Sequence, residues 1–326
     1  MKVVNEDRLA RQKEKLTREF GSELIGLLGS DDVVEIMLNP DGKIWIERLG
    51  KDMEVLSNSM DEHRALALIG TMASYHETIV DRDNPFLQCE VPLDGSRFQA
   101  WIPPISTKPC FCIRRRASSV FSLAEYVDQR VMTAVQAEEI KRAVQSRKNI
   151  LIVGGTGSGK TTLANAIINE VVIECPDHRV FVIEDTAEIQ CNAQNAIVLR
   201  TSLAASLLDL IKTTLRGRPD RIIVGEVRAG AEALALLKAW NTGHPGGIAT
   251  IHANSAESGL SRLEQLIMEV STSPMTKLVG EAIDLVIAIA RSKENGASRK
   301  ITEVLTITGG ENGQYQTSSG ELQAYG

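Results

Sequence analysis

The stretch Asn149–Asn165, NILIVGGTGSGKTTLAN, decides the fold of this 326-residue chain. Its apolar run at 150–153 predicts a buried strand, and the segment from Lys160 onward predicts a helix. Between them, Gly154 is followed after four residues by Gly159-Lys160-Thr161, the pattern of a phosphate-binding loop. Glycines there adopt backbone angles that a β-carbon forbids, so amide N–H groups can surround phosphate oxygens. The sequence therefore predicts a nucleoside triphosphate site.

The residues of this loop have separate expected roles. Lys160 supplies a cation to the β- and γ-phosphates, and Thr161 offers its hydroxyl to Mg²⁺. The following helix directs its N-terminal partial positive charge at the same anion. The glycine spacing differs from that of a dinucleotide-binding turn. The predicted cofactors are ATP and Mg²⁺. The predicted nucleotide-binding residues of the loop are Gly154, Gly155, Thr156, Gly157, Ser158, Gly159, Lys160, Thr161 and Thr162.

Strands and helices alternate after this stretch. Strands are expected at 149–153, 179–183, 196–199, 221–224, 247–251 and 284–290, and helices at 160–172, 206–215, 231–240 and 256–270. Such alternation predicts an α/β fold, with a mainly parallel sheet covered on both faces. The tail from Gly309 is rich in glycine, serine and glutamine and is expected to be frayed.

The first part of the chain has a different pattern. Helices are expected at 6–28 and 61–75, the second with Asp61 as its N-cap, and strands at 33–38, 43–47, 91–93, 97–102 and 110–116. This predicts a smaller α+β domain with a mainly antiparallel sheet. The expected domains are residues 1–125 and 133–326, joined by a linker at 126–132.

Composition excludes several classes of protein. The net charge is −6, which argues against direct nucleic-acid binding as the main activity. The five cysteines include no Cys-x-x-Cys pair, so reduced cytoplasmic thiols are expected rather than a zinc site or disulfides. The charged N-terminus does not resemble a signal peptide. The apolar run 282–290 is too short to span a bilayer and contains Asp284. Any membrane association is therefore expected to be peripheral.

Carboxylates follow two of the expected strands. Glu184 and Glu188 lie in VIEDTAE, and Glu226 lies in IIVGEVR. In an open α/β sheet, ligands bind beyond the carboxyl ends of the strands, where such side chains can hold a metal or orient water. We expect Glu226 to be the main hydrolytic carboxylate, with Glu184 and Glu188 serving metal and water. Thr161 and Glu184 are the predicted metal-binding residues.

A histidine and several arginines complete the predicted site. His252 closes the strand of GHPGGIATIHAN and is expected to sense the γ-phosphate, although a structural role stays open. A metal pair with His244 lacks a third ligand at suitable spacing. Arginines placed against a γ-phosphate can be worth about 10³–10⁵ in rate, but a charged run is often only a solvated edge. The arginines considered are Arg97, Arg114, Arg115, Arg116, Arg200, Arg216 and Arg218, of which Arg114 and Arg116 share a strand face opposite Arg115.

The strings GGTGSGKTT, VIEDTAE, LRGRPDRIIVGEVR and GHPGGIATIHANS occur in this order along residues 154–256. They resemble the Walker A, Asp box, Walker B and His box of the secretion ATPase superfamily, and the conjugative-transfer and type IV secretion branch most closely. The tetracysteine module of the type II branch is missing from the sequence. The resemblance implies a RecA-like P-loop ATPase domain in a hexameric ring. The predicted catalytic residues are Glu226, Glu184, Glu188, Lys160 and His252. The resemblance further implies that Arg97 and Arg114 cap the nucleotide.

The resemblance also implies a cytoplasmic protein docked peripherally at the inner membrane. Its partners would be inner-membrane components of a conjugation or type IV secretion channel, and it would power pilus assembly and substrate export. A type IV pilus assembly or retraction motor shares this chemistry and differs in its partners. A RecA-like DNA-binding ATPase shares the core, but the net charge argues against it. A small-molecule kinase would need an acceptor pocket and a lid, and the sequence has no motif for either.

Overall fold

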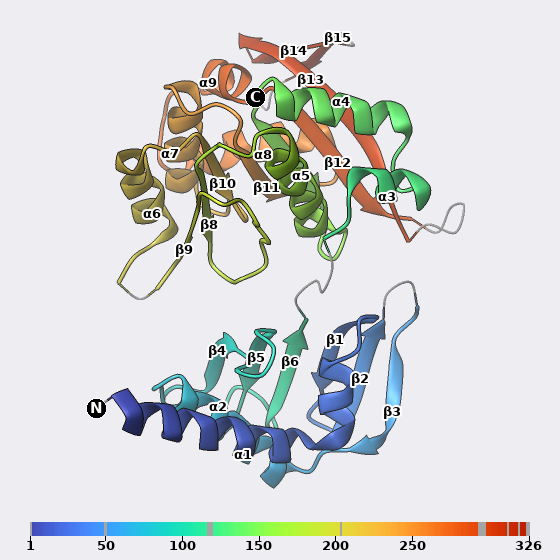
Figure 1. Ribbon diagram of the computed structural model, residues 1–326, viewed down its shortest axis with the longest axis vertical. Coiled ribbons are helices and arrows are strands. Elements are labelled where there is room, and N and C mark those ends of the chain that lie inside the picture. The colour runs from blue at the N-terminus through green and yellow to red at the C-terminus, as the bar shows by residue number, and fades with distance from the viewer. Residues whose placement is uncertain are drawn as a thin grey trace. The chain divides into compact units, whose positions relative to one another are not determined.

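The computed structural model describes residues 2–48, 51–115, 120–202, 204–292, 298–311, 313–318 and 320–323. The chain divides into two compact units, residues 1–118 and 119–326. Figure 1 shows a sheet with helices in each of them. The residues expected to form a linker include the buried side chains of Tyr126, Val131 and Met132, which belong to the core of the second unit.

The first unit is an antiparallel sheet with helices against one face (Figure 1). The strand order is β3-β2-β1-β6-β5-β4. Leu16 and Phe20 of the first helix and Met72 of the second pack against buried strand residues such as Ile36 and Phe98. The elements are α1 (Lys2–Leu28), β1 (Val33–Leu38), β2 (Lys43–Arg48), β3 (Glu54–Ser59), α2 (Glu62–Tyr75), β4 (Phe86–Glu90), β5 (Arg97–Trp101) and β6 (Cys110–Arg114).

The secondary structure predicted from the sequence of this unit is partly confirmed. Asp61 caps α2 as expected, because its carboxylate accepts a bond of 2.9 Å from the amide of Arg64. The expected strand at 91–93 is wrong, since the amide of Gly95 closes a turn onto the carbonyl of Val91 there. Strands β3 and β4 were missed. Strand β3 is almost wholly exposed, so it carries no apolar alternation to predict it.

The second unit contains a sheet of order β15-β14-β13-β12-β7-β11-β10-β8-β9. Strands β12 to β9 are parallel, as predicted, and the three strands at the other edge are antiparallel. The strands are β7 (Ile150–Gly154), β8 (Val180–Glu184), β9 (Ala196–Arg200), β10 (Arg221–Val224), β11 (Ile248–His252), β12 (Leu285–Arg291), β13 (Arg299–Glu311), β14 (Gln314–Thr317) and β15 (Gly320–Gln323).

Helices cover both faces of the parallel strands (Figure 1). Successive side chains of β7 enter opposite cores, with Leu151 and Val153 on one face and Ile150 and Ile152 on the other. The first face is covered by α6 (Leu207–Thr214), α7 (Gly230–Asn241), α8 (Ala256–Met268) and α9 (Thr276–Ala282), with a 3-10 turn, η1 (Leu215–Gly217), after α6. The second face is covered by α3 (Leu123–Asp128), α4 (Ala134–Gln145) and α5 (Lys160–Glu174).

The expectation of a frayed tail from Gly309 is wrong for the residues described. Strand β13 continues to Glu311 and pairs with β14. Tyr315 is buried, and its hydroxyl donates a bond of 2.6 Å to Oε1 of Glu264 on α8. A β-carbon on Gly310 would lie 2.4 Å from the carbonyl oxygen of Thr276. Glycine is therefore needed at this position for close packing against α9.

Candidate nucleotide-binding site

The glycine-rich loop joins β7 to α5 at the carboxyl edge of the parallel strands. Gly157 and Gly159 have left-handed backbones, with φ of 67° and 97°, and Gly159 is the N-cap of α5. A β-carbon is disfavoured in this conformation, which explains the glycines. Ser158 between them is buried, and Thr156 is exposed. The loop therefore has the backbone geometry that lets amides surround an anion.

Lys160 lies under this loop with little exposure. Its Nζ donates to the carbonyl oxygens of Gly154 at 2.9 Å and Gly155 at 3.1 Å, and it lies 3.2 Å from Nδ1 of His252. An ammonium group only donates, so Nδ1 of His252 accepts and Nε2 carries the ring proton. Nε2 then donates to Oε1 of Glu226 at 2.8 Å. Lys160, His252 and Glu226, predicted separately from the sequence, are thus joined by hydrogen bonds.

Glu188 is the carboxylate that lies beside Thr161. The Thr161 hydroxyl donates to Oε2 of Glu188 at 3.1 Å. The segment that carries Glu188 is held to α5 by Asn165, whose side chain contacts the carbonyl of Glu188 at 3.1 Å and the amide of Gln190 at 2.9 Å. The hydroxyl of Thr161 and the carboxylate of Glu188 thus place side-chain oxygens, the atom type that Mg²⁺ prefers, together at the start of α5.

Glu184 has a different environment. Its side chain is buried, and Oε2 accepts bonds of 2.9 Å from the amides of Glu188 and Ile189. Oε1 lies 3.4 Å from Nε of Arg200. Burial raises the pKa of the Glu184 carboxyl, while the two amides and Arg200 act in the opposite direction. These contacts shape the turn that brings Glu188 to Thr161, and the structure describes no direct contact between Glu184 and Thr161.

The loop after β10 carries a further charged cluster. Oε2 of Glu226 contacts Nε of Arg228 at 2.6 Å and Nη2 at 2.5 Å. Nη1 of the same arginine lies 2.9 Å from Oδ2 of Asp185, which follows β8. Strands β8 and β10 are parallel neighbours, so their carboxyl ends lie side by side. A continuous chain of polar contacts therefore runs from Asp185 through Arg228, Glu226 and His252 to Lys160.

The predicted arginines of the first unit have different surroundings. Arg97 and Arg114 are directly opposite each other on β5 and β6. Nε of Arg114 lies 3.9 Å from Oε1 of Glu35. Arg115 points to the other face, where it donates to the carbonyls of Leu27, near the end of α1, and of Ser30, just after α1. Arg115 thus has a structural role, and Arg116 lies outside the described residues. The phosphate contacts of Arg97 and Arg114 stay a prediction.

A known family model covers most of this chain. A family model described as Type II/IV secretion system protein matches residues 21–321. This chain belongs to that family. It is 52% identical over 307 residues to the conjugal transfer protein TrbB of Rhizobium radiobacter, covering 94% of this chain and 94% of that protein. It is 49% identical over 312 residues to the probable conjugal transfer protein TrbB of Sinorhizobium fredii, covering 96% of this chain and 94% of that protein.

The structure is similar in fold to the X-ray structure of the Legionella pneumophila ATPase DotB. The TM-score is 0.63 at 22% identity, over 86% of this chain and 78% of that chain. The resemblance inferred from the Walker A, Asp box, Walker B and His box strings is confirmed by the family match. Among the described helices of this Type II/IV secretion system protein, none is both long enough and apolar enough to cross a bilayer.

Several residues of this family member were missed by sequence reasoning. Asp185 directly follows β8 and Arg228 lies in the loop after β10, and these positions could have identified them. Arg291 and Arg299 could not be found in the same way, because they are brought opposite each other by the pairing of β12 with β13. Nε of Arg291 lies 3.3 Å from the carbonyl oxygen of Gly157. These guanidiniums add positive charge beside the loop.

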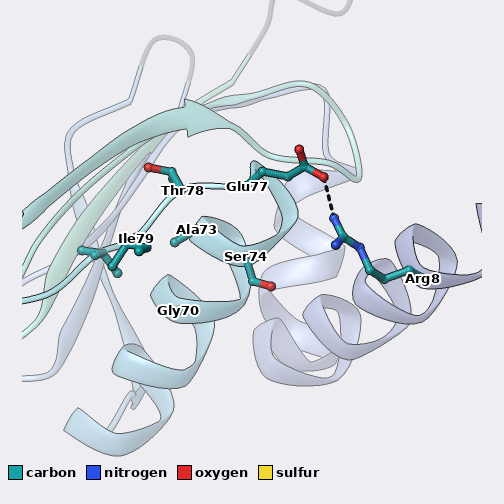
Figure 2. Close-up of a pocket in the computed structure, with 8 residues that line it drawn as sticks. Arg8, Gly70, Ala73, Ser74, Glu77, Thr78 and Ile79 are labelled. Carbon is teal, nitrogen blue, oxygen red and sulfur yellow. Dashed lines mark hydrogen bonds and ion pairs between the residues drawn. The ribbon is translucent and has the colours of Figure 1, made fainter. Parts of the chain in front are cut away.

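Other predicted features lie elsewhere. Nδ1 of His244 lies 3.2 Å from the carbonyl of Pro219, a contact unrelated to His252. Thr162 is half-buried on α5. Within the described ranges, no group of three or more His, Cys, Asp or Glu side chains is arranged to hold a metal. A cavity of about 480 Å³ lies beside α2 in the first unit, where Arg8 pairs with Glu77 at 2.8 Å (Figure 2). The predicted nucleotide-binding residues do not line it.

Proposed function

We propose that this chain is an ATP-hydrolysing motor of a conjugative transfer or type IV secretion system. The observation that carries the proposal is the bonded row Lys160–His252–Glu226 beside a glycine-rich loop. Two relatives about half identical to this chain are named as conjugal transfer proteins, which favours this branch over a pilus motor. The second unit would act as a RecA-like P-loop ATPase.

The residues of the loop fit a triphosphate bound with Mg²⁺. The left-handed glycines and the start of α5 give an anion site formed by backbone amides. The ammonium group of Lys160 already lies at this loop, and on nucleotide binding it would exchange its contacts with the carbonyls of Gly154 and Gly155 for contacts with phosphate oxygens. Thr161 and Glu188 are the side chains best placed to hold Mg²⁺ directly or through water. The ion would neutralise charge on the phosphates.

Hydrolysis would use Glu226 as the carboxylate that orients and deprotonates the attacking water. Its side chain is mostly buried, and one of its oxygens is held by His252, whose other ring nitrogen contacts Lys160. When Lys160 moves onto the phosphates, Nδ1 of His252 loses its present donor. The contact between His252 and Glu226 would therefore differ between the nucleotide-free and ATP-bound states. The contacts of His252 would in this way depend on whether a γ-phosphate is bound.

The first unit would complete the site with guanidiniums. Arg97 and Arg114 lie together on the sheet face opposite the helices, where they are available to an anion. ATP would close the units onto each other, and phosphate release would reopen them and move a bound partner. We further propose a hexameric ring docked peripherally at the cytoplasmic face of the inner membrane, in contact with channel components. Measuring the particle mass with and without ATP and Mg²⁺ tests the ring directly.

The Glu226→Gln variant tests the catalytic assignment. Glutamine keeps the shape of the side chain but does not take up a proton, so turnover should fall by about 10²-fold or more. Nucleotide affinity should stay near that of the natural chain. Both quantities are measured by phosphate release and equilibrium binding, with Glu269→Gln at an exposed position as the matched control. Turnover retained in Glu226→Gln would contradict the assignment and point to Glu184 instead.

The Arg114→Ala variant tests the coupling between the units. Loss of a guanidinium that contacts the phosphates should lower turnover by about 10³-fold or more, in the range measured for arginines of this kind. The control is Arg18→Ala, an exposed arginine on α1. Unchanged affinity and unchanged turnover in Arg114→Ala would refute closure of the first unit on the nucleotide.

A further inference from the structure

Arg228 contacts two carboxylates that come from neighbouring strands. Two of its nitrogens reach Oε2 of Glu226, at 2.6 and 2.5 Å, and the third reaches Oδ2 of Asp185 at 2.9 Å. Its own backbone is fixed, because Oε2 of Glu232 accepts from the amides of Arg228 at 3.3 Å and Ala229 at 3.2 Å. The guanidinium is therefore fixed at its base and at its charged end.

These contacts determine the direction of the Glu226 carboxylate. One oxygen is held by the guanidinium fork and the other by Nε2 of His252 at 2.8 Å. A glutamate side chain has several rotatable bonds, and without both contacts it would sample other rotamers. Because catalysis depends steeply on the placement of the reacting group, a displaced carboxylate lowers the rate even when substrate binding is unaffected.

We infer that Arg228 is a positioning residue that aims Glu226 at the attacking water and joins the loop after β10 to the loop after β8 through Asp185. This inference rests on the proposed function, in which Glu226 is the hydrolytic carboxylate. A guanidinium suits the task because its planar fork fixes an orientation, whereas the ammonium of a lysine acts as a point charge.

The exposure of the residues separates this role from one in stability. Half of the Arg228 side chain and 34% of the Asp185 side chain are exposed to solvent. The exposed pair with Asp185 contributes little to folding, and Glu226, which is 17% exposed, keeps its contact with His252. Replacing Arg228 should therefore lower the melting temperature only slightly. Its effect should appear in catalysis, where the orientation of Glu226 matters.

The first experiment compares Arg228→Gln and Arg228→Lys in ATP hydrolysis by the full chain. Arg228→Gln should lower kcat by about 10²-fold, with the affinity for ATP within about threefold of the natural value. Arg228→Lys should recover only part of the loss, because it keeps the charge and loses the fork. The control is Arg142→Gln, since Arg142 forms an exposed pair with Glu138 on α4. Full recovery by lysine would overturn the inference.

The second experiment combines Arg228→Gln with Glu226→Gln. If Arg228 acts through Glu226, it has nothing to orient in the Glu226→Gln background, and the double variant should match the single Glu226→Gln variant. If the losses in kcat of the two single variants multiply in the double variant, Arg228 acts independently of Glu226, and the inference is overturned. The two proposals fail in distinguishable ways. A natural chain that does not hydrolyse ATP ends the proposed function, whereas hydrolysis that survives Arg228→Gln ends only the positioning role.

Discussion

Replacing Tyr315 by phenylalanine removes one hydroxyl from a buried position on β14. That hydroxyl donates a bond of 2.6 Å to Glu264 on α8, and the two residues are 1% and 4% exposed. In Tyr315→Phe the ring still packs, but a buried carboxylate oxygen loses its donor and water has little access to replace it. Leaving such an acceptor without a partner costs about 1–3 kcal/mol of unfolding free energy.

For a unit of this size, that cost corresponds to a fall of about 2–12 °C in the melting temperature. Thermal and denaturant unfolding measure it, and faster hydrogen exchange at the amides of β14 would locate it at the C-terminal edge of the sheet. Tyr75→Phe, at a half-buried position on α2, is the matched control. A Tyr315→Phe melting temperature within about 1 °C of the natural value would refute this account of the edge.

Two further predictions concern pH and the loop. Burial first, and then the charges of Arg221 and Arg147, lower the pKa of His178, so the folded chain disfavours its protonation. The contribution of neutral His178 to the free energy of unfolding should therefore be fully present above pH 6.5 and be lost as acid protonates His178 in the unfolded chain. In His178→Gln, melting curves between pH 7 and 5 should show a smaller loss of stability. Gly157→Ala places a β-carbon against Arg291 in a left-handed conformation and should weaken nucleotide binding about tenfold. Gly26→Ala, on α1 where the β-carbon meets no atom within 4 Å, should bind nucleotide normally, and equal affinities in the two variants would contradict this reasoning.

Much of the fold could be predicted from the local pattern of apolar residues in the sequence. The parallel strands from 149 to 290 and the helices α5, α6, α7 and α8 were predicted with ends shifted by a few residues, whereas α9 was not predicted. Each predicted element has an apolar period or run that its burial requires. Strand β3 and the β13–β15 edge could not be predicted this way. Strand β3 is largely solvent-exposed, and the glycines near 310 permit close contact with α9, although in a sequence they indicate flexibility.

The residues of the candidate site could largely be predicted from the sequence, but which of them contact one another could not. The loop, Glu226 and His252 follow strands, and parallel strands bring such residues to one edge. Which carboxylate meets Thr161 was not decided by that rule. Glu184 is the last residue of β8, but its carboxylate accepts bonds from the amides of Glu188 and Ile189, and the turn so formed brings Glu188 to Thr161.

By itself the sequence determined the glycine-rich loop, the strands that precede the charged residues and the family. The loop and the strands are each encoded by neighbouring residues, and the family by four short strings in a fixed order. The tertiary structure alone decided which charges meet. Strands β7 and β8 are consecutive in the chain, yet β11 and β10 lie between them in the sheet. That order sets Arg228 between Asp185 and Glu226, and His252 between Glu226 and Lys160. Strand order depends on the packing of the whole sheet, so these contacts could not be read from any one segment.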